Sequence, residues 1–146
     1  MKEYTSTATI AASAETVWAI LTDGAEYRQW NPEIVGIDGR VALGQRITAH
    51  VRLGNGAIRT VAQRVTSLDA LRRMEWVGGL PLGLFVSRRS FTVTPVAGGV
   101  EFRLHLKMSG PLSPLILKSV GDRQPEIDSF TAALKSRAEK RSMRRS

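Results

Sequence analysis

Cysteine is absent from the 146-residue chain. This absence excludes disulfides, thiolate zinc sites, iron–sulfur clusters and a cysteine nucleophile, and it gives no sign of an oxidising compartment. The sequence also lacks any run of about 18 uninterrupted apolar residues, and its first residues do not place a basic segment before an apolar one. We therefore expect a soluble, cytoplasmic protein without a transmembrane segment.

The composition is that of an ordinary globular protein, with 42% hydrophobic and 23% charged residues. A chain of this size typically buries about 70% of the surface that its unfolded form exposes, so one core suffices without metal or disulfides. Neither internal repeats nor a linker divide the sequence. We expect a single domain over residues 1–140, followed by a basic tail over 141–146.

The basic residues are concentrated at one end of the chain. Residues 135–146 contain six basic residues and one Glu, which is +5 of the net charge of +8. A solvated, frayed helix end explains such a tail more simply than a nucleic-acid anchor does. We therefore do not expect nucleic-acid binding, and contact of the tail with an anionic membrane surface is a minor alternative.

The first third of the chain predicts a strand and two short helices. Residues 3–10 have the composition of a strand, and Ser13 follows as a helix cap whose hydroxyl can accept a backbone N–H bond. From Ala14 onward the apolar residues recur at helical spacing until the break at Gly24. A second short helix must end at Asn31, because the residue before a proline avoids the α region.

From residue 33 to 108 the pattern changes to the alternation of β-strands. Turn residues divide this segment into about six strands of an antiparallel meander. In the clearest strand, Val100 to Met108, apolar residues alternate with polar ones, so one face is expected to be buried and the other wet.

After Gly110 the apolar residues return to helical spacing, which can extend to about residue 140. Gly121 and Pro125 interrupt this stripe. We expect either a kink there or two helices that meet there, because proline removes a backbone donor and clashes with the preceding turn. A helix weakened at this point would open locally, and we consider it a candidate gate.

This order of elements predicts an α+β fold. A curved antiparallel sheet of about seven strands would wrap around a long, kinked C-terminal helix, with two short helices after the first strand. Such an arrangement tends to leave a hollow between sheet and helix, and concave, mostly apolar hollows are the usual sites for small molecules.

Several segments resemble one known superfamily. Ala14–Asp23 and Tyr27–Pro32 are similar to the opening signature of the SRPBCC superfamily, which includes START domains, polyketide cyclases and birch-pollen allergens and has the helix-grip fold. Further similarities are Gly44–Ile47, Leu71–Trp76 and Ser109–Leu112, together with the strand around Phe91. The resemblance covers essentially the whole chain. It implies a cavity for a hydrophobic molecule such as a lipid or polyketide, or, in fewer members, cyclisation or dehydration chemistry.

The sequence departs from that family pattern at two places. Related proteins often carry a His two residues before the Phe of the sixth strand and a Glu shortly before the Ser/Thr-Gly step. Here the first position is Arg89, and the second region, His105–Met108, contains no acid. This departure makes ligand binding or transport our first hypothesis for function.

The expected cavity wall combines aromatic and aliphatic side chains from the sheet with the start of the C-terminal helix. Each residue taken alone is equally well explained as packed core. The candidate ligand-binding residues are Tyr27, Trp30, Met74, Trp76, Phe85, Arg89, Phe91, Leu104, Leu106, Met108, Leu112, Leu115, Ile116 and Ser119.

Arg89 shares strand parity with Phe85 and Phe91, which should face the interior. An inward arginine must be paired or must reach a cavity mouth, and an anionic group of the ligand is one candidate partner. The alternative, which we favour at this stage, is that Arg89 lies near a bend and extends to water.

An enzyme of the polyketide cyclase/dehydratase type is the alternative function. Arg89 would then hold an oxyanion, and Tyr27 or a rim acid such as Glu33 or Asp38 would carry the proton. An interaction module that uses the basic outer face is a third hypothesis.

The two histidines, His50 and His105, should lie on outward faces of their strands, so we expect surface histidines and not metal ligands. The glycines at 54–56 and 78–79 lie between predicted strands and indicate hairpin turns, not phosphate loops. We therefore expect no metal and no cofactor.

Overall fold

The computed structural model describes residues 1–145 of the chain. Seven strands form one antiparallel sheet in the order β1-β7-β6-β5-β4-β3-β2. This confirms the predicted α+β fold and the strand number. The strands are β1 (Lys2–Ile10), β2 (Ile34–Asp38), β3 (Arg46–Arg52), β4 (Ile58–Asp69), β5 (Arg73–Leu80), β6 (Phe85–Val96) and β7 (Gly99–Ser109).

Two short helices follow β1, as expected: α1 (Ala14–Thr22) and, after a 3₁₀ turn over Gly24–Glu26, α2 (Tyr27–Trp30). The Ser13 side chain caps α1 by accepting a hydrogen bond from the Thr16 N–H at 3.1 Å. A second 3₁₀ turn, Pro81–Gly83, joins β5 to β6.

The C-terminal segment forms two helices, α3 (Ser113–Val120) and α4 (Gln124–Arg145). Of the two predicted outcomes at Gly121 and Pro125, the meeting of two helices is therefore the one observed. Gly121 ends α3 with a φ of 76°, a conformation that favours glycine. Pro125 lies in the first turn of α4, where the missing N–H has no intrahelical partner to lose.

Helix α4 continues beyond residue 140 to Arg145. The basic segment over 141–145 is thus the last part of a long helix, and Ser146 of the expected tail lies outside the described residues. None of the helices within residues 1–145 is long and apolar enough to cross a membrane.

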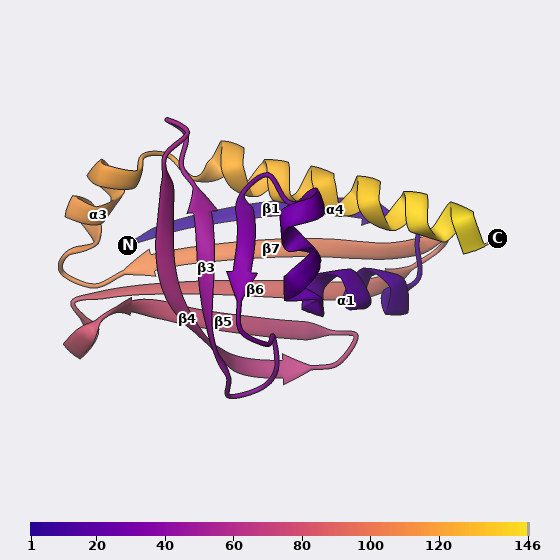
Figure 1. Cartoon of the computed structure of the whole chain (residues 1–146), viewed down its shortest axis with the longest axis horizontal. Helices are drawn as coiled ribbons and strands as arrows, with labels where there is room; N and C mark the ends of the chain where they lie inside the picture. Colours follow the sequence, from indigo (N-terminus) through magenta and orange to yellow (C-terminus); the bar gives the residue numbers. More distant parts are fainter. Residues whose placement is uncertain (146) are drawn as a thin grey trace.

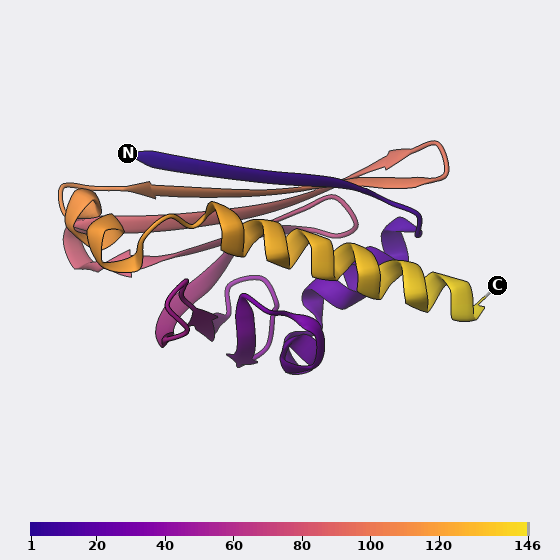
Figure 2. The same cartoon turned by 90° about the horizontal axis from the view of Figure 1, so that it is seen from above.

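The sheet is strongly curved, so that β1 and β7 run along the molecule whereas β3 runs across it (Figure 1). Helix α4 lies in this curve, with β1 and β7 on one side and the N-terminal helices on the other (Figure 2). Its buried face repeats at helical spacing and consists of Ile127, Phe130, Leu134 and Ala138, all 0% exposed.

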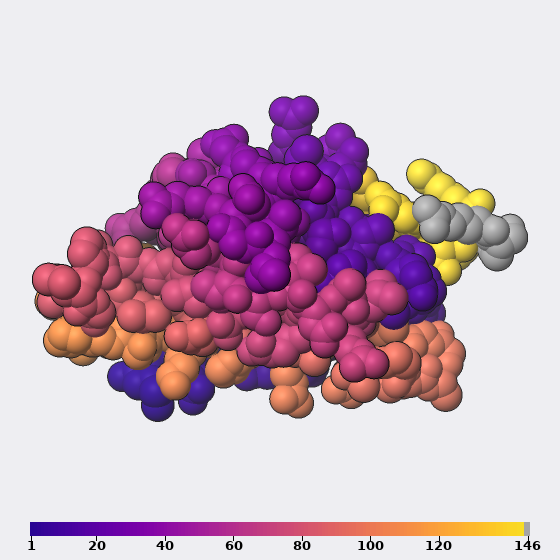
Figure 3. All heavy atoms as spheres, turned by 90° about the horizontal axis from the view of Figure 1, so that it is seen from below, coloured from indigo at the N-terminus to yellow at the C-terminus, as the bar shows by residue number. Residues whose placement is uncertain are grey.

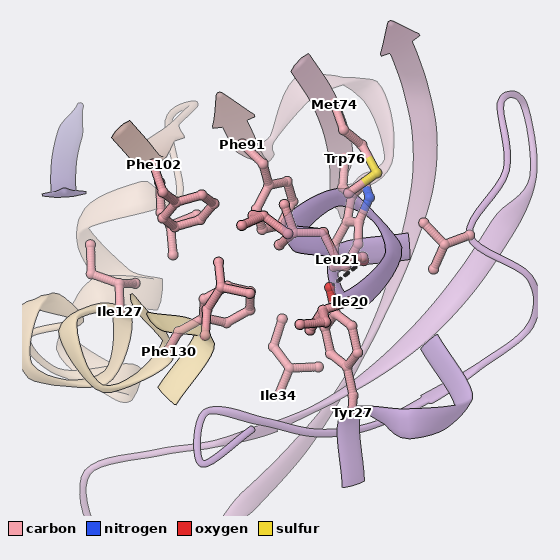
Figure 4. Close-up of a cluster of buried hydrophobic side chains, with 14 of the residues drawn as sticks. Ile20, Leu21, Tyr27, Ile34, Met74, Trp76, Phe91, Phe102, Ile127 and Phe130 are labelled. Atoms are coloured by element: carbon pink, nitrogen blue, oxygen red, sulfur yellow. Dashed lines mark hydrogen bonds between the residues drawn. The ribbon is translucent and has the colours of Figure 1, made fainter. Parts of the chain in front are cut away.

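An aromatic cluster fills one part of the space between α4 and the sheet (Figure 4). Phe130 lies at its centre, with ring centroids 6.1 Å from Tyr27, 5.7 Å from Phe91 and 6.3 Å from Phe102. Trp76 packs edge-on against Phe91 at 4.8 Å. This half of the interior is therefore solid core, and any cavity must lie elsewhere.

Candidate functional site

Arg89 points into the interior from the middle of β6. In the sheet it stands opposite Trp76 of β5 and Leu106 of β7, both of which are buried. Arg89 itself is only 4% exposed, and its guanidinium carbon lies 5.9 Å from the Phe130 ring centroid. The expectation that Arg89 extends to water is therefore wrong, because a carboxylate inside the protein meets it.

That carboxylate belongs to Glu33, which is completely buried just before β2. Arg89 Nη1 donates to Glu33 Oε1 at 2.8 Å and Arg89 Nη2 donates to Oε2 at 2.6 Å. Two parallel bonds of this kind fix both the distance and the plane of the pair. The sequence analysis treated Glu33 as a rim acid, and this placement corrects it.

Local backbone structure explains why Glu33 lies where it does. The Asn31 side chain accepts hydrogen bonds from the N–H groups of Glu33 and Ile34, both at 2.9 Å. Asparagine commonly organises a turn in this way. Arg52 N–H of β3 also donates to the Glu33 carbonyl at 2.8 Å, so the segment is anchored to the sheet edge.

A second arginine completes the cluster from the link between α3 and α4. Arg123 Nη2 donates to Glu33 Oε2 at 3.0 Å, and the Arg123 side chain is only 3% exposed. We call Glu33, Arg89 and Arg123 the buried triad. With Glu33 ionised, two guanidinium groups meet one carboxylate, so the triad carries a net charge of +1.

The protonation states of the triad follow from these contacts. Burial by itself raises the pKa of Glu33, but the charges and hydrogen bonds of Arg89 and Arg123 outweigh it and hold that pKa below the usual value of 4.5. Burial conversely lowers the pKa of Arg89, and Glu33 more than compensates. All three groups are therefore charged near neutral pH.

Not every hydrogen-bonding atom of the triad is satisfied. Arg89 Nε and Arg123 Nη1 are buried and have no acceptor. The nearest carboxylate oxygen given for Arg123 Nη1 is Glu126 Oε2, at 3.8 Å, beyond hydrogen-bond distance, and that oxygen also lacks a partner. A buried donor without an acceptor is costly, so such atoms often mark a place where another molecule binds.

A small cavity lies beside the triad, between the sheet and α3. Its volume is about 90 Å³. Apolar side chains make up most of its wall, and Arg59, Arg89 and Arg123 are its charged members. The wall consists of Val51, Leu53, Arg59, Val61, Gln63, Phe85, Ser87, Arg89, Leu106, Met108, Ile116, Val120 and Arg123.

The predicted ligand-binding residues divide into three groups. Five line the cavity, namely Phe85, Arg89, Leu106, Met108 and Ile116. Six belong to or pack against the solid core, namely Tyr27, Trp30, Met74, Trp76, Phe91 and Leu104. The others lie on or next to α3 outside the cavity wall: Leu112 is half-buried, Leu115 and Ser119 are exposed, and Ser119 accepts a hydrogen bond from Arg59 at 3.0 Å.

Sequence reasoning missed part of the wall, in particular Arg59, Gln63 and Arg123. The first two lie on β4, whose alternation is weak because polar residues occupy inward positions. Arg123 follows the break at Gly121, where helical periodicity no longer predicts a direction. The useful signal was the requirement that an inward arginine have a partner.

The proposed proton carriers of the enzyme hypothesis lie away from the cavity wall or stay charged. Burial raises the pKa of Tyr27, and its hydroxyl donates to the Leu21 carbonyl at 2.6 Å. Asp38 lies on the surface, 2.8 Å from His50 Nε2. His105 Nε2 lies 3.2 Å from Glu3 Oε1, so each histidine has a carboxylate neighbour at the outer face of the sheet.

A comparison of the sequence with family models decides the classification. The model described as polyketide cyclase / dehydrase and lipid transport matches residues 1–139. The chain belongs to this family. The match spans the sheet, the cavity and most of α4, so the SRPBCC resemblance predicted from the sequence is confirmed. A search of curated protein sequences found no significant match.

Solved structures of similar fold extend this result. The Zhui aromatase/cyclase from Streptomyces sp. R1128 superposes with a TM-score of 0.75 at 19% identity, covering 96% of this chain and 94% of the other. A START superfamily protein from Mycobacterium smegmatis gives 0.71 at 22% identity, covering 94% and 97%. Protein MLL2253 from Mesorhizobium loti gives 0.72 at 17% identity, covering 95% and 98%. At these identities the likeness establishes the helix-grip fold of the polyketide cyclase/dehydrase and lipid transport family.

Proposed function

We propose that this member of the family binds a hydrophobic small molecule that carries an anionic group, and that it acts by sequestration or delivery. One observation carries the proposal: the cavity has an apolar wall whose charged side chains are arginines, two of which belong to the buried triad. Apolar surface would hold the body of the ligand, and a guanidinium would hold its carboxylate or phosphate.

The excess positive charge of the triad supports the anionic group. Two buried guanidinium groups share one carboxylate, and each retains a nitrogen without an acceptor. An incoming anion would neutralise this excess in a region where water screens charges poorly. Glu33 would stay in place during binding and hold both arginines in position.

The size of the cavity implies that binding involves movement of α3. Small-molecule sites usually enclose about 300–1,000 Å³, whereas this cavity measures about 90 Å³. Within α3 only Ser113 is buried, and the helix is flanked by Gly110 and Gly121, with φ values of 100° and 76°. An outward displacement of α3 would enlarge the cavity at little cost in buried apolar surface.

Binding is better supported than catalysis. A cyclase or dehydratase must move a proton, and arginine does not release one near neutral pH. Arg89 can hold an oxyanion, but the carriers considered with it are an ionised Glu33, a Tyr27 bonded to Leu21, and a surface Asp38. The cytoplasmic location expected from the sequence belongs to the same proposal.

Isothermal titration with two probes of equal chain length tests the proposal. Decanoate carries a carboxylate, whereas 1-decanol carries only a hydroxyl. We expect decanoate to bind at least about tenfold more tightly, because an ionic hydrogen bond is stronger than a neutral one. Equal affinities, or no binding of either probe, would contradict the anion-bearing ligand.

A cavity-filling variant locates the binding site. Ile116→Trp places a larger side chain in the wall, and Leu117→Trp makes the same change one residue further along α3, outside the wall. Decanoate should no longer bind to Ile116→Trp and should bind normally to Leu117→Trp. Equal affinities of both variants would place the ligand elsewhere.

A further inference from the structure

One end of the molecule carries a cluster of exposed leucines, which we call the leucine tip. It comprises Leu80, Leu82 and Leu84 of the β5–β6 hairpin and Leu115 of α3, which are 43%, 97%, 40% and 64% exposed. The Leu112 N–H donates to the Leu84 carbonyl at 2.9 Å and thereby holds the two segments together. Clusters of this kind are uncommon on isolated soluble proteins and mark interaction sites.

The space-filling view shows the hairpin and α3 side by side at this end of the molecule, with the end of α4 at the opposite end (Figure 3). The leucine tip is thus separate from the basic C-terminal segment. Membrane contact considered from sequence alone was assigned to that segment, and the exposed apolar surface lies elsewhere.

Leu82 is presented in an unusual conformation. Its φ of 61° lies in the left-handed region, which leucine rarely adopts. Glycine or asparagine would occupy this turn position at lower cost, and neither would expose an apolar side chain to water. A leucine that is both strained and 97% exposed is therefore explained better by an interaction than by folding.

Positive charge surrounds the leucine tip. Arg46 and Arg64 line a surface groove together with Leu80 and Pro81. Lys118 lies three residues after Leu115 on α3, which puts the two side chains on one helix face. Within the described residues, no ion pair is found for Arg46, Arg64 or Lys118. The tip is thus apolar at its point and basic at its rim.

We propose that the leucine tip docks on the surface of an anionic lipid bilayer. Apolar side chains would enter the headgroup region, and the basic rim would face lipid phosphates, the combination that gives peripheral proteins their membrane affinity. A second copy of the chain fits less well. A two-fold interface brings each patch against itself, so the rims of Arg46, Arg64 and Lys118 would repel each other.

The leucine tip adjoins the entrance of the cavity. Leu84 directly precedes Phe85 and Leu115 directly precedes Ile116, and both following residues line the cavity wall. Docking would therefore bring α3 and the cavity against the lipid. This inference goes beyond the proposed function, because vesicle binding is measured without any cavity ligand and can succeed or fail independently of it.

Sedimentation with lipid vesicles tests the proposal. One set of vesicles is pure phosphatidylcholine, and the other contains about 30% phosphatidylserine. We expect the protein to bind the anionic vesicles, Leu82→Asp to lower the partition coefficient about tenfold or more, and the double variant Arg64→Glu/Lys118→Glu to lower it similarly. Aspartate tolerates the left-handed conformation, so Leu82→Asp preserves the turn.

Two controls make the result decisive. Val96→Asp replaces another exposed apolar residue, 40% exposed, at the opposite end of β6, and it should bind vesicles like the unaltered protein. Lys140→Glu/Arg141→Glu changes the end of α4. The proposal is overturned if the unaltered protein does not bind, if it binds both vesicle types equally, if Leu82→Asp has no effect, or if only the α4 variant loses binding. Concentration-dependent dimerisation that Leu82→Asp abolishes, without vesicle binding, would assign the tip to a second copy.

Discussion

Arg89 and Glu33 form a two-pronged ion pair across the interior, with N···O distances of 2.8 and 2.6 Å. The partners are 56 positions apart in the chain and come from β6 and from the residue before β2. The pair therefore links the middle of the sheet to its far edge, next to α4 and the cavity. Arg123 joins the same carboxylate and ties the start of α4 to it.

Removal of the carboxylate should destabilise the protein strongly. Glu33→Gln leaves two buried guanidinium groups without a counter-charge, and loss of one partner of a buried pair typically costs about 3–5 kcal/mol. Asp38→Asn breaks a surface pair and is the control, with an expected loss of no more than about 1 kcal/mol. Urea denaturation of the two variants measures both values. Similar small losses would show that the triad contributes little to stability.

The same carboxylate should make stability depend on acid pH. Because the folded pKa of Glu33 lies below its ordinary value of 4.5, the folded state binds this proton less readily than the unfolded state. Its contribution is fully present above pH 4.5 and is lost as the pH falls through the folded pKa. Glu75 and Glu139 also have lowered pKa values, so the informative quantity is the difference between the unaltered protein and Glu33→Gln. That difference should shrink with falling pH, and a constant difference would contradict this assignment.

The aromatic cluster should depend on Phe130 more than on any apolar residue at the cavity end. Phe130→Ala removes a fully buried ring that contacts Tyr27, Phe91 and Phe102, and a cavity of this origin typically costs about 3–5 kcal/mol. Leu115→Ala removes a side chain that is 64% exposed and should cost less than about 0.5 kcal/mol. Thermal unfolding compares the two variants, and equal losses would contradict the packing described here.

Hydrogen exchange should distinguish the two C-terminal helices. Amides of α3 should exchange faster than those of α4 between Ile127 and Leu134, because α3 buries little apolar surface. The α4 segment packs against the sheet along its whole buried face. Mass spectrometry of exchanged fragments measures this directly. Equal protection of α3 and the central strands would exclude α3 as the gate.

Local patterns in the sequence were enough to predict most of the fold. Alternation in Val100–Met108 gave a strand with one buried face, and Ser13 marked the start of a helix. The turn residues between strands gave the number of strands, because these signals depend on neighbouring residues and on one or two backbone angles. Gly121 and Pro125 marked the break between α3 and α4 for the same reason. The choice between a kink and two helices depended on which turn of the helix holds Pro125.

The site needed the tertiary structure. Strand parity placed Arg89 on the interior face, but its direction depends on whether a carboxylate lies within reach, and Glu33 belongs to a distant segment. Likewise the same parity applies to Phe91, which packs on Phe130, and to Phe85, which lines the cavity. A one-dimensional pattern states that a side chain is buried. Only the curvature of the sheet around α4 decides whether it meets another side chain, an opposite charge or an open space.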